Sequence, residues 1–440
     1  MILTSDVALV GGKMVERFAL QIESGTIVAC GPRASLPSDT EVLDLGHKAM
    51  LPGTVNAHNH SFQSLLRGFG DDLPFLKWRD RALYRYSPRL GREGVYTGAL
   101  FAFSEMALHG VTAVCDFFYI NSHSNENARA VIVAARAVGL RVVLARCFYD
   151  WEGAPAEYRE SVDEARGHFL ALHGEFQHAR DVAIHAAPHS LHGASEKMIR
   201  AGAEAANSVG VPWHIHLAEE RYQVEDAKKQ YGTTPLKAID QLGLLDENMI
   251  AVHGCWFDEE ERALLAKRGA KLAYNPNSNM FLGDGVTDVV DLHRRGVKVA
   301  LGTDGGCSNS RVSIFDEMRS CALLQKVARA LAGDDSAGQA IDAETCFEMG
   351  TKSGGDVLGL PVGQLSVGQR ADVVFVDLDD PSLWPEQSLA KNVVYSMSAR
   401  AISDVFVDGK PVVRDRNLVN LAIGEVQARV RSLTAEWCRD

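Results

Sequence analysis

Eight short apolar segments, rich in β-branched residues, recur through the middle of the chain, with amphipathic stretches between them. Continuous apolar runs of this length predict parallel strands buried on both faces, and the amphipathic stretches predict the helices that cover them. Eight strand–helix units over roughly 250 residues favour an α/β fold closed into a (β/α)8 TIM-type barrel. The predicted strands end near Ala57, Phe117, Cys147, Ala187, His216, His253, Tyr274 and Gly302.

The two ends of the chain have a different pattern. Residues 1–50 and 361–420 consist of short alternating segments separated by glycine turns. Two short β-rich pieces that flank a barrel pair most simply with each other. We therefore predict one small β-sandwich domain built from both ends, a barrel over residues 51–360 and a C-terminal helix over residues 421–440.

Charge and composition exclude several classes of partner. The chain carries 57 acidic and 45 basic side chains, a net charge of −12, and no block of Lys or Arg, which argues against nucleic acid or an anionic membrane as partner. There is no apolar run of about 18 residues and no basic N-terminal signal. The eight cysteines form no CxxC pair. These features predict a cytoplasmic protein with reduced thiols, whose partners are a small-molecule substrate and water.

Histidines and carboxylates follow several predicted strands, at the end of a barrel where active sites form. His58 and His60 flank one residue in an extended segment, so both imidazoles project to the same side. His216 and Asp304 follow two other strands and converge on the same mouth. Three neutral imidazoles and one carboxylate suit Zn²⁺ or Fe²⁺, so we predict a divalent metal site at these residues.

Two further residues are placed to move protons. Glu219 lies three residues after His216, and His253 ends the next predicted strand. A carboxylate that shuttles protons without binding the metal is the arrangement of zinc deaminases. An HxH pair, a TDG tripeptide or a lone histidine is a weak signal by itself. The prediction depends on their occurrence at successive strand ends, in an order that a barrel brings together.

The segments LPGTVNAHNH, HIHLAEE, VHGCW, YNPNSNMFLGDG and LGTDGG resemble the cytosine-deaminase-like branch of the amidohydrolase superfamily, over essentially the whole chain. The resemblance implies a metal-dependent hydrolase, with Glu219, His253 and Asp304 in catalysis. Its reaction adds water to an amidine-type C=N carbon and releases ammonia. Binuclear relatives need a lysine at the end of the fourth strand, and HAAPHSLHGAS has none. The resemblance therefore implies one metal ion, preferably Zn²⁺ with Fe²⁺ as the alternative, and such barrels are often homo-oligomers.

One subfamily, formiminoglutamate deiminase, resembles this chain at HNHSFQ, KWRDRALYR, DFFY and APHSL. Where that family has an arginine three residues after His189, this chain has His192. An arginine can bind a carboxylate through two parallel hydrogen bonds and a histidine cannot, so this change is not conservative. The resemblance still favours a small formimino or guanidino substrate with an anionic end. The predicted substrate contacts are Gln63, Arg79, Tyr119, His189, His192 and Asn277.

The alternative substrate is an aminated purine nucleoside or a related heterocycle of the guanine, pterin or triazine type. The methylthioadenosine/S-adenosylhomocysteine deaminase group is similar at LLRGFGDDLPFLKW, at YNPNSNM and at the tail NVVYSMSARAISDVFVDGKPVVRD. His189 matches a substrate-positioning histidine in both subfamilies, but SLHG replaces the aromatic run that follows it in the nucleoside deaminases. The sequence leaves both substrates open.

Two readings from other classes are disfavoured. A non-catalytic scaffold on the same fold would lack metal ligands, whereas every ligand and both proton-transfer residues are present here. A hydrolase of amides, cyclic amides or C–Cl bonds is disfavoured by Glu219, which indicates protonation of a nitrogen, and by the missing lysine.

Overall fold

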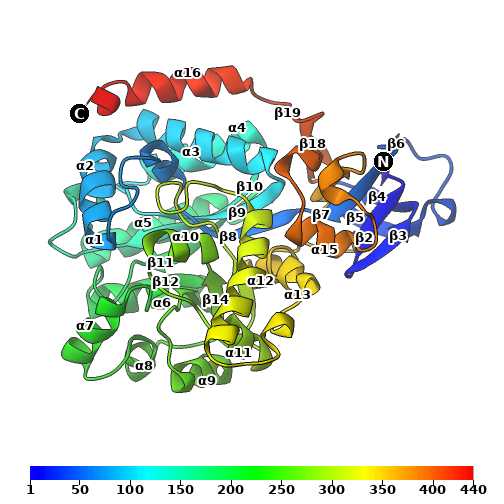
Figure 1. Cartoon of the computed structure of the whole chain (residues 1–440). Helices are drawn as coiled ribbons and strands as arrows, with labels where there is room; N and C mark the ends of the chain where they lie inside the picture. The colour runs from blue at the N-terminus through cyan, green and yellow to red at the C-terminus, as the bar shows by residue number, and fades with distance from the viewer. Residues whose placement is uncertain (440) are drawn as a thin grey trace.

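The computed structural model describes residues 1–439, and at its centre a parallel sheet of eight strands curls into a nearly closed barrel (Figure 1). The strands follow one another around the sheet in chain order. They are β8 (Thr54–Asn59), β9 (Val111–Phe118), β10 (Arg141–Phe148), β11 (Val182–Pro188), β12 (Trp213–Leu217), β13 (Met249–His253), β14 (Lys271–Tyr274) and β15 (Val299–Leu301). All eight lie where the apolar runs predict strands, because a strand between the barrel interior and a covering helix has no solvent face.

The first and last barrel strands meet beside the predicted site. The backbone amide of Asp304 donates to the carbonyl oxygen of His58 at 3.0 Å, and that of Thr303 donates to Oδ1 of Asn56 at 3.1 Å. At Gly302 a Cβ atom would come within 2.8 Å of the backbone nitrogen of His58. A glycine is therefore required where these two strands approach so closely.

Helices cover the outside of the barrel and connect its strands (Figure 1). Side chains cap several of their first turns, as in the capping boxes at Ser161 and Asp258, and left-handed glycines such as Gly139 and Gly210 end others. The helices are α3 (Arg92–Leu108), α4 (Glu126–Val138), α5 (Val162–Phe176), α6 (Glu196–Val209), α7 (Arg221–Tyr231), α8 (Pro235–Gln241), α9 (Glu259–Arg268), α10 (Pro276–Leu282), α11 (Val289–Arg294), α12 (Ile314–Leu331), α13 (Ala343–Met349) and α14 (Lys352–Leu358).

Strands from both ends of the chain pair beside the barrel. One sheet has the order β19-β18-β17-β16-β7-β2-β3, and a second has the order β5-β4-β1-β6. β16 runs antiparallel to β7, so the two ends of the chain share a sheet. The strands are β1 (Ile2–Thr4), β2 (Val7–Val10), β3 (Lys13–Glu16), β4 (Phe18–Glu23), β5 (Thr26–Pro32), β6 (Val42–Asp44), β7 (Lys48–Pro52), β16 (Val373–Asp377), β17 (Ile402–Val407), β18 (Lys410–Arg414) and β19 (Asn417–Leu418).

The predicted fold class, a (β/α)8 barrel with a small β domain built from both chain ends, is confirmed. The sheets have a small core of their own, which includes Leu20, Met50, Phe375 and Phe406. The domain boundaries stay predictions, and β7 itself runs across the predicted boundary at residue 50.

The C-terminal helix α16 (Ile423–Thr434) lies along α3 (Figure 1). Beyond it, the ring of Trp437 packs against Tyr86 and Phe69, with centroid distances of 5.1 and 6.4 Å. Both partners belong to the connection between β8 and α3, which contains the short helices α1 (Phe75–Trp78) and α2 (Tyr84–Tyr86). The end of the chain thus supports a segment that also lines the site described below.

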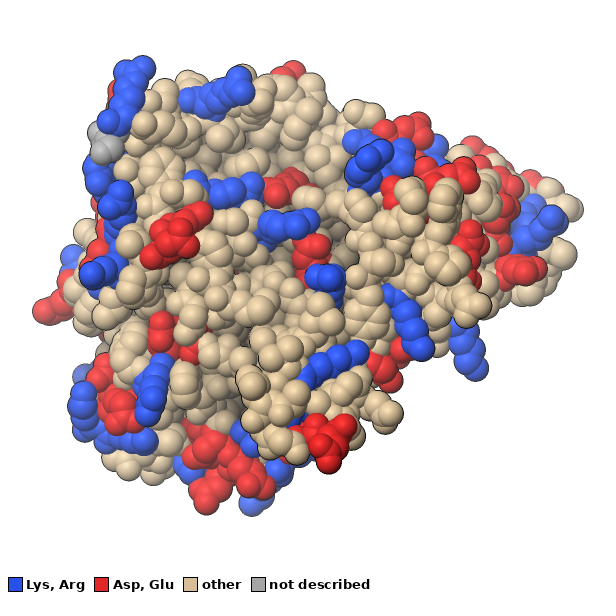
Figure 2. Space-filling view, viewed as in Figure 1, with Lys and Arg blue, Asp and Glu red and all other residues tan. Residues whose placement is uncertain are grey.

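Acidic and basic side chains are interspersed over the face of the molecule in Figure 2, with broad uncharged surface between them. This face presents no continuous basic patch of the kind that binds nucleic acid. Within residues 1–439, no helix combines the length and the apolarity that crossing a membrane requires.

Candidate active site

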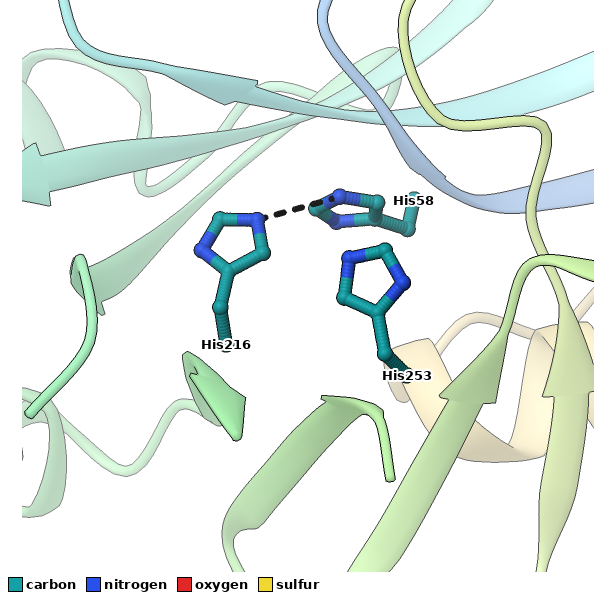
Figure 3. Close-up of side chains that lie close together, drawn as sticks. All are labelled: His58, His216 and His253. Atoms are coloured by element: carbon teal, nitrogen blue, oxygen red, sulfur yellow. Dashed lines mark hydrogen bonds between the residues drawn. The ribbon is translucent and has the colours of Figure 1, made fainter. Parts of the chain in front are cut away.

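The side chains predicted as metal ligands lie together at the carboxyl ends of the barrel strands. The rings of His58, His216 and His253 point toward one another (Figure 3). Nε2 of His216 lies 3.3 Å from Nε2 of His58. Oδ1 of Asp304 lies 3.5 Å from Nε2 of His58 and 3.3 Å from Nε2 of His60. The barrel therefore brings these side chains together at its mouth, with His58 near both His216 and Asp304.

Three separations between ligand atoms, those of His58 to His216 and to Asp304 and that of His60 to Asp304, fit a tetrahedral metal ion. His58, His60 and Asp304 form one group whose ligand atoms all lie within 4.8 Å of one another, and His216 forms another such group with His58 and His253. Ligand atoms about 2.0–2.2 Å from a tetrahedral zinc ion lie about 3.3–3.6 Å from one another. All four side chains are buried, so the imidazole nitrogens and the carboxylate oxygen have little water to satisfy them. Three imidazoles and one carboxylate form a donor set that Zn²⁺ and Fe²⁺ both accept. The residues present fit a divalent metal ion.

In His60 and His216, a hydrogen bond at Nδ1 determines that Nε2 is the nitrogen facing the other predicted metal ligands. Nδ1 of His60 lies 2.6 Å from the carbonyl oxygen of Phe117, and Nδ1 of His216 lies 2.8 Å from that of His189. Each Nδ1 must donate its proton to the carbonyl, which leaves a lone pair on Nε2. Burial lowers the pKa of His60 to about 4, so the ring is neutral at pH 7. A neutral imidazole with a free Nε2 is the form that binds a metal.

Asp304 is held from the side away from the histidines. The hydroxyls of Ser278 and Ser308 donate to its Oδ2 atom at 2.5 and 2.8 Å, so Oδ1 faces His58 and His60. Burial favours the neutral acid, but the contacts with the two histidines outweigh burial and hold the pKa of Asp304 well below its usual range. The group is a charged carboxylate, as metal binding requires.

In His253 the other ring nitrogen, Nε2, carries the proton. The side-chain amides of Asn279 and Asn275 donate to its Nδ1 at 2.9 and 3.3 Å. Its Nε2 therefore carries the proton, and this atom lies 3.4 Å from Oε1 of Glu219. Burial lowers the pKa of His253 to about 3, so the ring is a neutral hydrogen-bond donor. This geometry supports the predicted role in proton transfer over a role as metal ligand.

Glu219 lies beside His253 and is buried, with 7% of its surface exposed. Burial, together with the nearby carboxyl groups of Asp284 and Asp304, raises the pKa of Glu219 well above its usual range. The side-chain amide of Gln223 approaches its Oε2 at 3.5 Å. A carboxyl group that can carry a proton at neutral pH is suited to act as a general acid and base.

Three residues beside the cluster have backbone conformations that L-residues adopt rarely. Ala218, His253 and Asp304 have φ values of 49°, 73° and 56°. Such conformations cost of order 1–3 kcal/mol each and persist where the surrounding structure imposes them. All three lie where β12, β13 and β15 end, so the strain is concentrated at the predicted site.

A cavity opens over the predicted metal ligands. Its walls contain six aromatic side chains, Phe75, Trp78, Tyr84, Tyr119, Tyr149 and Tyr158. Among the described residues that line it, Arg79 is the one Lys or Arg. The predicted contacts Gln63, His189 and His192 line the same cavity, as do Glu219 and His253.

The predicted contacts in this cavity already have partners. The amide of Gln63 donates to the hydroxyl of Tyr119 at 2.7 Å. The guanidinium of Arg79 lies 4.8 Å from the centre of the Tyr84 ring, and its Nη2 lies 2.8 Å from Oδ1 of Asp80. Its positive charge is therefore partly compensated before any substrate binds.

Asn277 is not among the residues that line this cavity, and its role as a substrate contact stays a prediction. Its backbone and side-chain amides donate to Glu317 at 3.0 and 2.9 Å, and it borders a separate hollow along α10 and α12. The residue follows a strand end as predicted, but α10 begins one residue earlier, at Pro276, and carries the side chain away from the barrel mouth.

Sequence reasoning did not find several residues that line or support the site. Tyr149 and Tyr158 come from the segment after β10, and Tyr84 comes from α2. The aromatic-rich run FYDWEGAPAEY, directly after a predicted strand, was a signal that could have identified the first two. No sequence signal marks Ser278 and Ser308 as partners of Asp304, because their contact depends on the closure of the barrel.

Fold and site together define a barrel hydrolase of the metal-dependent type. The amidohydrolase family matches residues 49–412, so the chain belongs to this family. This protein is a hydrolase that acts on carbon–nitrogen bonds.

Three similar proteins are informative. A 5-methylthioadenosine/S-adenosylhomocysteine deaminase from Syntrophobacter fumaroxidans is 34% identical over 425 residues, which cover 96% of this chain and 93% of that protein. A 5′-deoxyadenosine deaminase from Methanothermobacter thermautotrophicus is 34% identical over 426 residues, which cover 96% and 95%. The crystal structure of an adenosine deaminase from Xanthomonas campestris with bound zinc has a TM-score of 0.91 at 28% identity and covers 99% of this chain and 98% of that one.

Proposed function

We propose that this protein hydrolytically deaminates an aminated purine nucleoside of the adenosine type. The cavity lining carries the proposal, because six aromatic side chains and one arginine surround the space above the cluster. Aromatic rings stack on a heterocyclic base, whereas formiminoglutamate carries paired carboxylates that need several cationic partners. The nucleoside deaminases among the similar proteins support the same choice. The alternative substrate from the sequence thus replaces the acyclic formimino compound that we expected first.

We propose further that the metal is one Zn²⁺ ion, with Fe²⁺ as the alternative, held by His58, His60, His216 and Asp304. Such an ion lowers the pKa of water toward neutrality and so supplies a nucleophile at pH 7. The Nε2 lone pairs and the charged Asp304 described above support this ligand set.

The proton transfers belong to Glu219 and His253. Glu219 takes a proton from the attacking water and delivers it to the ring nitrogen beside the amine-bearing carbon, while the new C–O bond forms. The Nε2–H of His253 donates a hydrogen bond to the oxygen that adds. The remaining hydroxyl proton then passes to the amine, the C–N bond breaks, and ammonia leaves as the carbonyl group forms. The raised pKa of Glu219 supports its delivery of a proton to the ring nitrogen.

Substrate contacts follow from the lining of the cavity. We propose that the aromatic walls hold the base and the sugar, and that Gln63, Tyr119 and His189 orient the base above the cluster. We propose that Arg79 and His192, which line the same cavity, face the substituent on the sugar.

Ammonia release from a substrate panel tests the proposed function. The zinc-loaded protein would be given 5′-deoxyadenosine, methylthioadenosine, S-adenosylhomocysteine and N-formimino-L-glutamate. We expect at least one nucleoside to reach a kcat/KM of about 10⁴ M⁻¹s⁻¹ or more, with formiminoglutamate at least about a hundredfold lower. Efficient turnover of formiminoglutamate alone would overturn the choice of substrate and leave the reaction class in place.

Two predictions from the sequence concern the compartment in which the protein works and its oligomeric state. All eight cysteines are free thiols in the structure, which supports our proposal that the protein works in the reducing cytoplasm. Assembly into a homo-oligomer stays a prediction, and light scattering of the purified protein would test it.

A further inference from the structure

Glu317 is a fully buried carboxyl group on α12 that does not line the catalytic cavity, and burial raises its pKa to about 8. Its Oε2 accepts a hydrogen bond from the backbone amide of Asn277 at 3.0 Å. Its Oε1 accepts from the side-chain amides of Asn277 and Asn309 at 2.9 and 2.7 Å. A buried carboxyl group that accepts three hydrogen bonds is held in place, and it ties together the groups that donate to it.

The two asparagines flank the two serines that hold Asp304. Asn277 directly precedes Ser278, and Asn309 directly follows Ser308. Both serine hydroxyls donate to Oδ2 of Asp304, at 2.5 and 2.8 Å. The first serine belongs to α10 and the second to the loop after β15, so the carboxylate of Asp304 is held from two separate segments.

A third connection reaches the backbone of the same strand end. The side-chain amide of Asn309 also donates to the carbonyl oxygen of Thr303, the residue before Asp304, at 2.8 Å. Asp304 has a strained backbone with a φ of 56°, and a strained residue keeps its geometry only where its surroundings impose it. Glu317 joins α10, through Asn277, to the loop after β15, through Asn309.

We propose that Glu317 is a positioning residue that holds Asp304 in the geometry needed to bind the metal. It acts through Asn277 and Asn309, which set the positions of Ser278 and Ser308. This inference rests on the metal site of the proposed function. In this inference Asn277, which lies outside the cavity, helps to position Asp304. Hydrogen-bond partners behind metal ligands typically change metal affinity by roughly 10–100-fold.

Glu317→Gln tests the inference, because the new amide nitrogen would face the amide donors of Asn277 and Asn309 while the side chain keeps its shape. We expect zinc affinity, measured by competition with a chromophoric chelator, to fall by about tenfold or more. We expect kcat at saturating zinc to fall as well, with KM within about threefold of wild type, because the cavity walls are untouched.

Glu261→Gln is the matched control. Glu261 is also fully buried, and its carboxylate accepts from the backbone amides of Leu236 and Asp258 at 2.9 and 3.0 Å, on the outside of the barrel. This variant should lose stability without losing zinc affinity. Equal losses of zinc affinity in the two variants would mean a general effect of stability and would overturn the inference.

A milder variant keeps the test decisive if Glu317→Gln does not fold. Asn277→Ala removes one side-chain donor and leaves the backbone amide, so we expect a smaller loss of zinc affinity, about two- to fivefold. If Glu317→Gln folds and binds zinc with wild-type affinity, the inference is overturned. If Glu317→Gln does not fold, wild-type zinc affinity in Asn277→Ala overturns it instead. Wild-type protein that binds no zinc would instead overturn the metal site itself, so the two failures are distinguishable.

Discussion

At the scale of single residues, the site depends on how protons are distributed over a few imidazoles. His60 and His216 donate from Nδ1 to backbone carbonyls, whereas His253 accepts at Nδ1 from two asparagine amides. In the proposed mechanism the same type of side chain would therefore serve as metal ligand in one case and as proton donor in the other. Spacing in the sequence could place His58 and His60 on one side of a strand, but it could not show which nitrogen of any ring is protonated.

Glu219→Gln should separate metal binding from proton transfer. The amide keeps the shape of the side chain but cannot take a proton, so we expect kcat to fall by roughly 10²–10⁴ or more with zinc content unchanged. Metal analysis and steady-state kinetics on the same preparation would check both parts. Loss of zinc together with activity would place Glu219 among the ligands and contradict its assignment.

Arg79→Met should show whether this arginine binds an anionic end of the substrate. A charge-assisted hydrogen bond contributes roughly 1.5–3 kcal/mol, so KM for S-adenosylhomocysteine should rise by about tenfold or more. KM for 5′-deoxyadenosine, which has no carboxylate, should change by less than about threefold. Arg81→Met is the control, because Arg81 is exposed and does not line the cavity. Equal KM changes for both substrates would mean that Arg79 only supports the wall through Tyr84.

At the scale of elements, the sequence predicts the barrel strands well because each is a short run dominated by apolar and β-branched residues. It predicts the site less completely. Tyr149 and Tyr158 lie in the irregular segment after β10, and the path of that segment is determined by packing and not by a periodic sequence pattern. Asn277 shows the limit most clearly. The strand end at Tyr274 is where the pattern predicts it, yet the immediate start of α10 turns the residue toward Glu317.

Trp437→Ala tests the link between the chain end and the cavity wall. Trp437 is 6% exposed and packs on Tyr86 and Phe69. Removal of a buried tryptophan side chain typically costs about 3–5 kcal/mol of the free energy of unfolding. We expect a loss of about 3 kcal/mol in urea unfolding and a higher KM, because the segment with α1 and α2 loses its support. Trp437→Phe should lose less of both, and a wild-type KM in the destabilised alanine variant would disprove the link to the cavity.

At the scale of the whole molecule, buried neutral histidines make folding depend on pH. Burial lowers the pKa of His185 to about 3 and that of His192 to about 4. The unfolded chain, in which histidine has a pKa near 6.5, binds more protons between the two values than the folded protein does. Stability should therefore be full above about pH 6.5 and fall as the pH decreases toward the folded pKa values.

His185→Gln isolates one of these contributions. Between pH 7.5 and pH 5.0, one buried histidine with a folded pKa of about 3 should cost about 2 kcal/mol of the free energy of unfolding. Urea unfolding of the metal-free protein at the two pH values should show a smaller loss in the variant by about that amount. The same loss in both proteins would mean that His185 does not titrate on unfolding.

The most direct test of hydrolytic deamination is to run the reaction in ¹⁸O-labelled water and measure product and ammonia together. Using the best nucleoside of the panel, we expect one ¹⁸O atom in each product molecule and ammonia in equal amount, because water adds to the carbon that loses the amine. Product without ammonia, or ammonia with an unlabelled product, would contradict attack of water on a carbon–nitrogen bond at this site.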